Sequence, residues 1–217
     1  MPTIIDLSHP LCDGQLAFPG DPRPSIRVHG TLATAGYNIA TVSMSTHQAT
    51  HVDVPYHFFD DGKTLDDVPL DRFYGPAVLV DLAPGGVMAP QTPLTPQMFL
   101  PHAAKFAPAA RVLVRTGWDR AFGLPEFFTD FPSLTLEAAQ WIATRRIGLL
   151  GMDMPTPSRQ WREVHHALLG PPAEIMLVEG LANLEHVPER FVFAGLPLRL
   201  RQRDGSPIRA VAIVDGV

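Results

Sequence analysis

Residues 47–57 read HQATHVDVPYH, which places three of the nine histidines of the chain and one aspartate in a single short segment. In an extended backbone alternate side chains leave the same face, so His51 and Asp53 point one way and Val52 and Val54 the other. His47 joins the polar face if the chain turns or bulges after it. The segment therefore predicts a strand with one apolar face and one face of imidazoles and a carboxylate.

The polar face of this predicted strand has the composition of a catalytic metal site. Two imidazoles and one carboxylate suit Zn²⁺, Mn²⁺ or Fe²⁺, and three protein ligands leave positions open for water or substrate. A single histidine is more often a surface residue or a hydrogen-bonded core residue. Several such groups beside apolar strand residues, however, would be costly to bury unpaired, and a bound ion removes that cost. With Cys12 as the one cysteine, imidazole and carboxylate are the expected ligands.

The composition is that of a globular protein with a sizeable core. The 217 residues are 46% hydrophobic and 18% charged, which predicts one domain spanning residues 1–217. The formal net charge is −5 and the basic residues are scattered, which argues against a nucleic-acid partner. No run of roughly 18 uncharged apolar residues occurs, and the start MPTIIDLSHP lacks the features of a secretory signal. We therefore expect a cytoplasmic protein without a membrane partner.

Short apolar runs rich in β-branched residues recur along the chain and predict strands. They lie at Thr3–Leu7, Ser25–His29, Ile39–Met44, Ala77–Leu82, Arg111–Arg115, Ile147–Met152, Ile175–Glu179 and Ala210–Val214. Helices are predicted at Pro96–Phe106, Thr135–Arg145 and Gln160–Leu169. The 23 prolines fall mostly between apolar runs, which argues against a helix bundle. The sequence thus predicts a mixed α/β domain with more strand than helix, in a strand order that the sequence does not give.

The run HxxxHxDxPxH at residues 47–57, followed by FFDDGKT at 58–64, closely resembles the signature of the cyclase superfamily. The best-understood members of this superfamily are bacterial kynurenine formamidases and isatin hydrolases. Further resemblance lies in IDLSH at 5–9, FPGDP at 18–22, GMD at 151–153, HHALLG at 165–170 and VEGL at 178–181. The resemblance covers nearly the whole chain. It implies a β-rich swivelling β/β/α domain that forms homodimers or larger assemblies, with sites near the subunit contacts.

The resemblance also implies a role for particular residues. First-metal ligands would be His47, His51 and Asp53; Asp53 would bridge to a second metal, whose site His165 and Glu179 would complete. Zn²⁺ is the expected ion and Mn²⁺ the alternative, with one or two ions per subunit.

Other positions near the motif have two interpretations. His57 would be the catalytic acid/base, or else an outer partner that hydrogen-bonds a ligand or a water. His166 rivals His165 as a ligand, because the segment up to Glu179 is longer than in relatives. Ala49 stands where relatives often have glycine, a change that is tolerated if the backbone angle suits alanine. Asp153 would be either an outer partner of the site or the polar end of a strand.

Aromatic residues near the motif could form a pocket for a planar ring, although ordinary core is the alternative for each. They are Tyr56, Phe58, Phe59, Phe73 and Tyr74, with Trp118 or Phe18 in addition, the last at a position where many relatives have tryptophan.

The implied activity is hydrolysis of a small-molecule amide by metal-activated water, with His57 protonating the departing nitrogen. N-formylkynurenine or a similar N-formyl aryl amine is the expected substrate, as for an arylformamidase. Hydrolysis of a cyclic amide such as isatin, or of a lactone, is the near alternative. A cyclase or dehydratase of secondary metabolism is another. A non-enzymatic metal-binding module would instead have a closed four-ligand shell.

Overall fold

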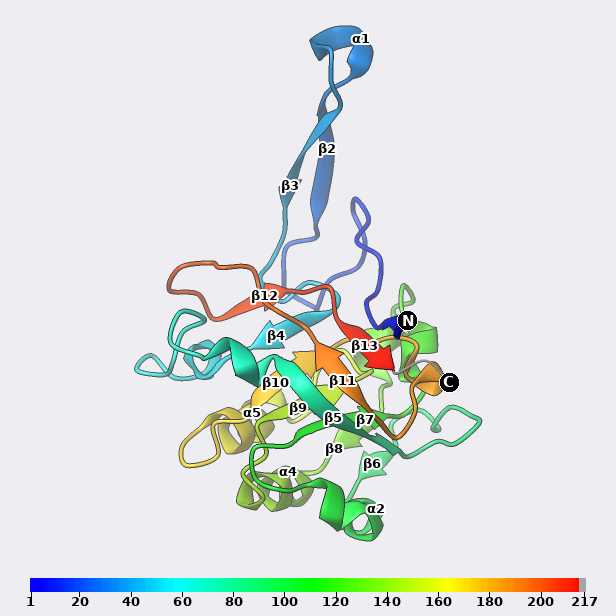
Figure 1. Cartoon of the computed structure of the whole chain (residues 1–217), viewed down its shortest axis with the longest axis vertical. Coiled ribbons are helices and arrows are strands. Elements are labelled where there is room, and N and C mark those ends of the chain that lie inside the picture. The colour runs from blue at the N-terminus through cyan, green and yellow to red at the C-terminus, as the bar shows by residue number, and fades with distance from the viewer. Residues whose placement is uncertain (215–217) are drawn as a thin grey trace.

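The computed structural model describes residues 1–214 and contains a nine-stranded mixed sheet in the order β1-β13-β11-β5-β7-β9-β10-β4-β12 (Figure 1). Its centre is parallel and consists of β5 (Tyr74–Asp81), β7 (Arg111–Arg115), β9 (Leu149–Met152) and β10 (Met176–Glu179). Antiparallel strands extend it on both sides: β11 (Arg190–Ala194), β13 (Val211–Val214) and β1 (Thr3–Asp6) beyond β5, and β4 (His51–Asp53) and β12 (Gly205–Pro207) beyond β10. The mixed α/β fold predicted from the sequence is confirmed.

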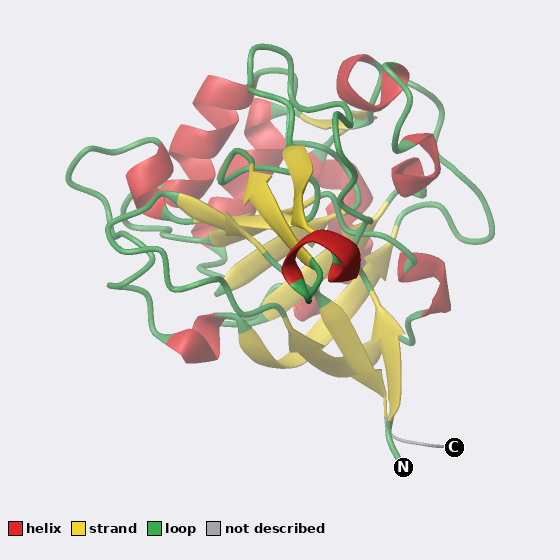
Figure 2. Ribbon diagram, turned by 90° about the horizontal axis from the view of Figure 1, so that it is seen from above, coloured by secondary structure: helices red, strands yellow, loops and turns green. Residues whose placement is uncertain are grey.

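Two helices, α4 (Leu136–Thr144) and α5 (Trp161–Leu169), cover one face of the sheet (Figure 2). Thr135 caps α4 by accepting a hydrogen bond from the backbone N–H of Ala138, as its hydroxyl favours. Shorter pieces are α1 (Leu32–Ala35), α2 (Pro96–Phe99), α3 (Glu126–Thr129) and the small parallel pair β6 (Pro93–Leu94) and β8 (Ser133–Leu134). Within the described residues, no helix is long and apolar enough to cross a membrane.

The central strands bury side chains on both faces, because helices cover one face and the curled antiparallel strands cover the other. In β7, Val112 and Val114 belong to the helix-side core, whereas Leu113 belongs to the core on the opposite face. Such two-sided burial explains why these strands read as continuous apolar runs. Val52 of β4 and Val54 just after it belong to the same core as Leu113, so the opposite face of β4 is turned toward the helices.

The structure differs from the sequence prediction in one helix and in several elements that were not predicted, among them α1, α3, β6 and β8. The predicted helix Pro96–Phe106 is broken: α2 ends at Phe99 and a 3₁₀ segment, Leu100–Lys105, follows. Pro101 lacks the backbone N–H that a continuous α-helix needs there. The strands β11 and β12 were not predicted from the sequence. Both lie in the sheet through pairing with strands distant in the chain.

A two-stranded arm projects from the body of the molecule (Figure 1). It consists of β2 (Ser25–Gly30) and β3 (Ile39–Ser43), connected through α1. Every residue of β3 is exposed. A lone two-stranded ribbon is at best marginally stable in water.

Candidate metal centre

The strand pairing at the end of the sheet brings four acidic and imidazole groups to one place. His51 of β4 lies directly opposite Glu179 of β10, so both side chains share the helix-side face, and Asp53 is two residues along on the same face. His165 reaches them from the buried side of α5. All four side chains are buried, so the structure gathers four ionisable groups in its core.

The distances in this cluster are those of donors that surround a common point. The Nε2 atom of His51 is 3.3 Å from Asp53 Oδ1 and 3.4 Å from Glu179 Oε2. The Nε2 atom of His165 is 3.2 Å from Glu179 Oε1 and 3.6 Å from Asp53 Oδ2. This Oδ2 atom is buried without a hydrogen-bond partner in the described structure. A divalent cation would satisfy it, and nitrogen with carboxylate oxygen is a suitable donor set.

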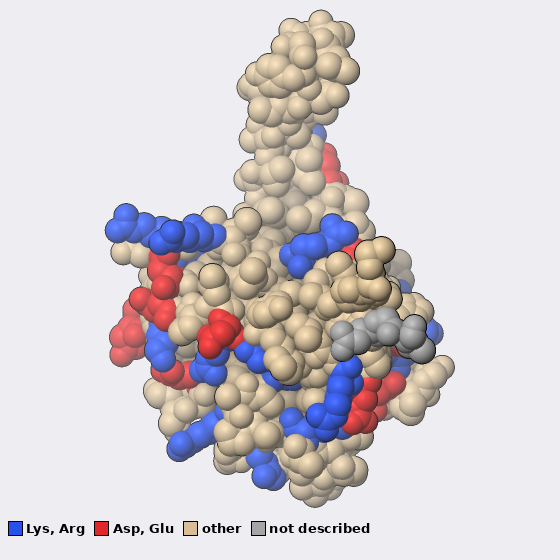
Figure 3. Space-filling model, in the orientation of Figure 1, with Lys and Arg blue, Asp and Glu red and all other residues tan. Residues whose placement is uncertain are grey.

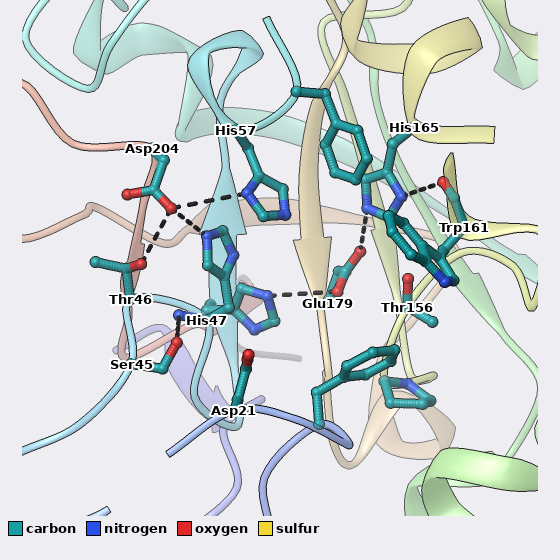
Figure 4. Close-up of a pocket in the computed structure, with 14 residues that line it drawn as sticks. Asp21, Ser45, Thr46, His47, His57, Thr156, Trp161, His165, Glu179 and Asp204 are labelled. Carbon is teal, nitrogen blue, oxygen red and sulfur yellow. Dashed lines mark hydrogen bonds and ion pairs between the residues drawn. The ribbon is translucent and has the colours of Figure 1, made fainter. Parts of the chain in front are cut away.

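Each of three histidines has one ring nitrogen directed at the centre and the other held by an oxygen outside it. His51 Nδ1 lies 2.9 Å from the carbonyl oxygen of Ala49, and His165 Nδ1 lies 2.6 Å from that of Trp161. His47 Nε2 lies 2.6 Å from Asp204 Oδ2, while its Nδ1 lies 2.8 Å from Asp53 Oδ1 (Figure 4). Because a carbonyl oxygen can only accept a hydrogen bond, it keeps a proton on the outer nitrogen, so the inner nitrogen is the one that could bind an ion.

Ala49, whose carbonyl holds His51, has a positive φ of 55°. This left-handed conformation favours glycine, the residue that relatives often carry here, and an alanine side chain is strained in it. The condition set at the sequence level, that the backbone angle should suit alanine, is therefore not met. Tight packing surrounds this strained residue. The carbonyl of Ala49 lies so close to Gly180 that a Cβ atom on Gly180 would be 2.6 Å from its oxygen.

The charges of the cluster shift the pKa values of its members in the metal-free state. Burial alone would lower the pKa of His47 and His165, yet the carboxylates beside them raise both to about 9. Burial would raise the pKa of Asp53, but the charges of His47 and His51 hold it well below its usual range. Without an ion, protons on the imidazoles thus offset the buried carboxylates. A divalent cation supplies the same compensation when it replaces them.

His57 lies beside this cluster rather than within it. Its ring stacks on that of His47 with the centroids 3.8 Å apart, and its Nδ1 atom is 3.7 Å from Asp204 Oδ2. The 3₁₀ turn Pro55–His57 after β4 positions it. Of the sequence-predicted residues, His47, His51, Asp53, His57, His165 and Glu179 converge on one region, and His166 is exposed and lies outside it.

A cavity of about 350 Å³ opens beside the cluster and is lined by His47, His57, His165, Glu179, Phe18, Asp21, Phe58, Trp161, Thr156 and their neighbours. Phe58 stacks on His165 with centroids 4.4 Å apart. Phe18 and Phe58 thus line the cavity as the sequence indicated, whereas Phe73 and Trp118 belong to the core. Trp161 also lines the cavity but was not predicted to do so. It reaches the cavity because it is the first residue of α5, and the sequence does not give the placement of this helix.

Sequence reasoning also missed Asp204, which contacts two histidines of the region. The one local signal was the glycine that follows it. A Cβ atom on Gly205 would lie 2.7 Å from His47 Cε1, so only glycine lets the chain approach the imidazole this closely.

Asp153 lies away from the cluster and supports the cavity wall. Its carboxylate accepts hydrogen bonds from Thr116 N and Oγ1 and from Gly117 N at 2.7–2.8 Å, and the chain continues from it into the wall residues Pro155 and Thr156. Burial raises the pKa of Asp153 to about 7, against these hydrogen bonds, which lower it. Of the two roles considered for this residue, the structure places it at the polar end of a strand, just after β9.

The raised pKa of Asp153 predicts a pH-dependent stability. The folded protein holds a proton there that the unfolded chain releases above about pH 4, so this contribution is complete at low pH and is lost as pH rises through about 7. Asp153→Asn mimics the protonated group. Between about pH 4 and 7, wild type should lose up to about 1.4 kcal/mol per pH unit of unfolding free energy relative to the variant, and above this range the difference should level off. Urea denaturation of both proteins measures the difference, and parallel pH curves would contradict the prediction.

Comparisons with known proteins agree with this arrangement. Residues 5–159 match the family model described as "Putative cyclase". A kynurenine formamidase of Bacillus cytotoxicus is 32% identical over 213 residues, covering 95% of each chain, and one of Bordetella petrii is 31% identical over 215 residues, covering 97% of this chain and 98% of that one. Isatin hydrolase A from Labrenzia aggregata superposes with a TM-score of 0.86 at 25% identity, over 99% of this chain and 94% of that one.

The fold and the cluster together define an α/β protein with a buried imidazole and carboxylate centre at one end of a mixed sheet. The family match covers more than half of the chain, and the similarity to curated relatives extends over nearly all of it. The chain belongs to the cyclase family.

Proposed function

We propose that the protein is a metal-dependent hydrolase of small amides, and specifically an arylformamidase acting on N-formylkynurenine or a similar N-formyl aryl amine. The observation that carries the proposal is the buried cluster of His51, Asp53, His165 and Glu179, which opens to a cavity with aromatic walls. The curated relatives at about a third identity are kynurenine formamidases. Aromatic walls suit a planar aryl ring, and the cluster lies where its amide would be.

The metal site of this proposal has two positions that share Asp53. Candidate donor atoms within 4.8 Å of one another form one group around His51, Asp53 and Glu179 and another around His47, Asp53 and His57. The two oxygens of Asp53 support a different division, because His47 and His51 face Oδ1 whereas His165 faces Oδ2 and Glu179. On this basis we assign His47, His51 and Asp53 to one ion and Asp53, His165 and Glu179 to a second. Zn²⁺ is the ion proposed and Mn²⁺ the alternative. A bound ion would polarise the amide carbonyl and make water a stronger nucleophile at neutral pH.

The side chains of the chain supply the remaining steps. Addition of water to the formyl carbon and cleavage of the C–N bond leave an amine nitrogen that needs a proton, because an amide anion is a very poor leaving group. We assign this proton transfer to His57, which lines the cavity and whose imidazole can donate a proton. Phe58 and Phe18 would hold the ring of the substrate. The products are formate and the free aryl amine.

A cyclic amide is the second candidate substrate, and the similarity to isatin hydrolase A favours it. The same attack by water opens a lactam ring instead of releasing formate. Lactone hydrolysis and metal-dependent cyclisation or dehydration are further alternatives. They would use the same residues on a different substrate.

An activity screen tests the proposal. Protein purified without added ions is analysed for metal, treated with a chelator and reloaded with Zn²⁺ or Mn²⁺, and formate release from N-formylkynurenine is measured beside ring opening of isatin and simple lactones. Activity that disappears on chelation and returns on reloading is expected, with formate release the fastest reaction. Faster opening of isatin would select the second candidate, and no metal-dependent turnover of any of these substrates would refute hydrolysis of amides.

We propose further that residues 1–217 act as one domain in a homodimer. The nine-stranded sheet that carries the site includes both the first strand of the chain, β1, and the last, β13, which supports one domain. The β2–β3 arm supports the dimer: Ile26 pairs with Val42 and Val28 with Ala40, so these side chains form an apolar face, which is largely exposed. On the face drawn in Figure 3, the outer part of the arm shows no Lys, Arg, Asp or Glu side chains, and charged groups are seen only near its base. A location in the cytoplasm stays a prediction from the sequence.

Val42→Asp should dissociate this dimer. Placing a carboxylate in an apolar contact costs several kcal/mol, which corresponds to a dissociation constant at least about 100-fold weaker. Thr41→Asp is the matched control, because Thr41 lies on the opposite face of the arm, across from Arg27. Light scattering over a dilution series measures both variants. A wild-type monomer, or equal behaviour of the two variants, would count against the arm as the dimer contact.

A further inference from the structure

The contacts of Asp204 connect the two histidines of the site that have separate proposed tasks. Its Oδ2 atom lies 2.6 Å from His47 Nε2 and 3.7 Å from His57 Nδ1, and it accepts a hydrogen bond from Thr46 Oγ1 at 3.2 Å (Figure 4). Among the described residues, these two imidazoles are its ion-pair partners.

Backbone hydrogen bonds fix the position of Asp204 beside the two histidines. Its carbonyl oxygen accepts the N–H of Val54 at 3.0 Å, at the end of the strand that carries His51 and Asp53. The next residue, Gly205, pairs with Asp53 across β12 and β4. The carboxylate is only partly exposed, at 28% of the side chain. A solvated surface carboxylate would need neither this anchoring nor the close approach that Gly205 permits.

One oxygen atom thus orients both rings. His47 Nε2 faces Asp204 and His47 Nδ1 faces Asp53, each at hydrogen-bond distance of a carboxylate oxygen. If Asp204 keeps the Nε2–H, a bound ion would take the place of the proton between Nδ1 and Asp53, which is the arrangement of a ligand held by an outer carboxylate. At 3.7 Å the contact with His57 is an ion-pair distance rather than a hydrogen bond. It turns Nδ1 of His57 toward the carboxylate, and Figure 4 shows the other ring nitrogen directed toward the middle of the site.

We propose that Asp204 is a positioning residue that acts through both histidines. It fixes the tautomer of His47 for binding the metal. It also holds His57 Nδ1, so that the Nε2 atom of His57 is directed at the substrate. The second part rests on the proposed hydrolase function, whereas the first part needs no substrate. The proposal therefore predicts two separable losses when the carboxylate is removed.

The test uses Asp204→Asn, which keeps the shape of the side chain, with Asp61→Asn as the control. Asp61 is an exposed carboxylate on the turn after the motif. Zn²⁺ affinity, measured by competition with a chelating dye, should weaken about 10–100-fold in Asp204→Asn and stay unchanged in the control. The tautomer of His47, measured by ¹⁵N NMR of the Zn²⁺-loaded protein, should lose its pure Nε2–H form in Asp204→Asn only.

Turnover at saturating Zn²⁺ tests the connection to His57. The kcat of Asp204→Asn should fall at least about tenfold with little change in KM, and the double variant with His57→Ala should be no slower than His57→Ala alone. Unchanged affinity and tautomer would overturn the role toward His47. Additive losses in the double variant, or kcat restored in full by excess Zn²⁺, would overturn the role toward His57. If no tested amide is hydrolysed, the affinity and tautomer measurements still decide the first role.

Discussion

Asp53→Asn is expected to abolish metal-dependent activity, with metal affinity reduced by more than about 100-fold. The reason is that both candidate groups of metal donors include Asp53, whose buried oxygens face His47, His51 and His165. Asparagine has nearly the same shape but no charge, so it leaves both positions one anionic ligand short. Metal analysis after dialysis, with formate release as the second readout, measures the effect.

The control for this variant is again Asp61→Asn, since it removes the same charge from the surface. It should retain metal and activity. If Asp53→Asn keeps a full complement of metal, the assignment of Asp53 as a shared ligand is wrong. Circular dichroism of both metal-free proteins separates loss of the ion from loss of the fold.

His57→Ala is expected to lower kcat by roughly 10²–10⁴ while the metal content stays near that of wild type. Its ring lines the cavity and stacks on His47 without entering the buried cluster, so its loss removes a proton donor but no central ligand. The measurements are kcat for formate release and metal content on the same preparation. A residue that merely hydrogen-bonds a ligand would show the opposite pattern, a loss of metal. Wild-type values for both would exclude either role.

Local pattern predicted much of the fold. All eight predicted strands occur with bounds shifted by at most a few residues, and the cap at Thr135 and the apolar spacing of α4 mark that helix correctly. Of the strands that were missed, β11 (RFVFA) is aromatic and β-branched, so local pattern could have indicated it. The others, β6, β8 and β12, have two or three residues that include Pro, Ser or Gly, and they form only through partners far away in the chain. Tertiary pairing, rather than propensity, decides such segments.

The residues of the site likewise fall into those that the sequence indicates and those that only the structure reveals. His51 and Asp53 are two residues apart on a strand, so their common direction follows from the sequence alone. The resemblance to the cyclase superfamily added His165 and Glu179, and the structure brings both to the cluster. Asp204 could not be found by either route, because only the pairing of β12 with β4 brings it to His47. The positive φ of Ala49 likewise depends on contacts that no local pattern reveals.

The position of β4 in the sheet has a consequence for how the protein matures. This strand has only three residues and lies between β10 and β12, both of which come more than 120 residues later in the chain. During synthesis, His51 and Asp53 can therefore be enclosed in the sheet only after the last quarter of the polypeptide has been made. If the site binds an ion, we expect its uptake to follow the pairing of β4 with its late neighbours, and a chain shortened before Gly205 would lack the strand that covers the outer edge of β4.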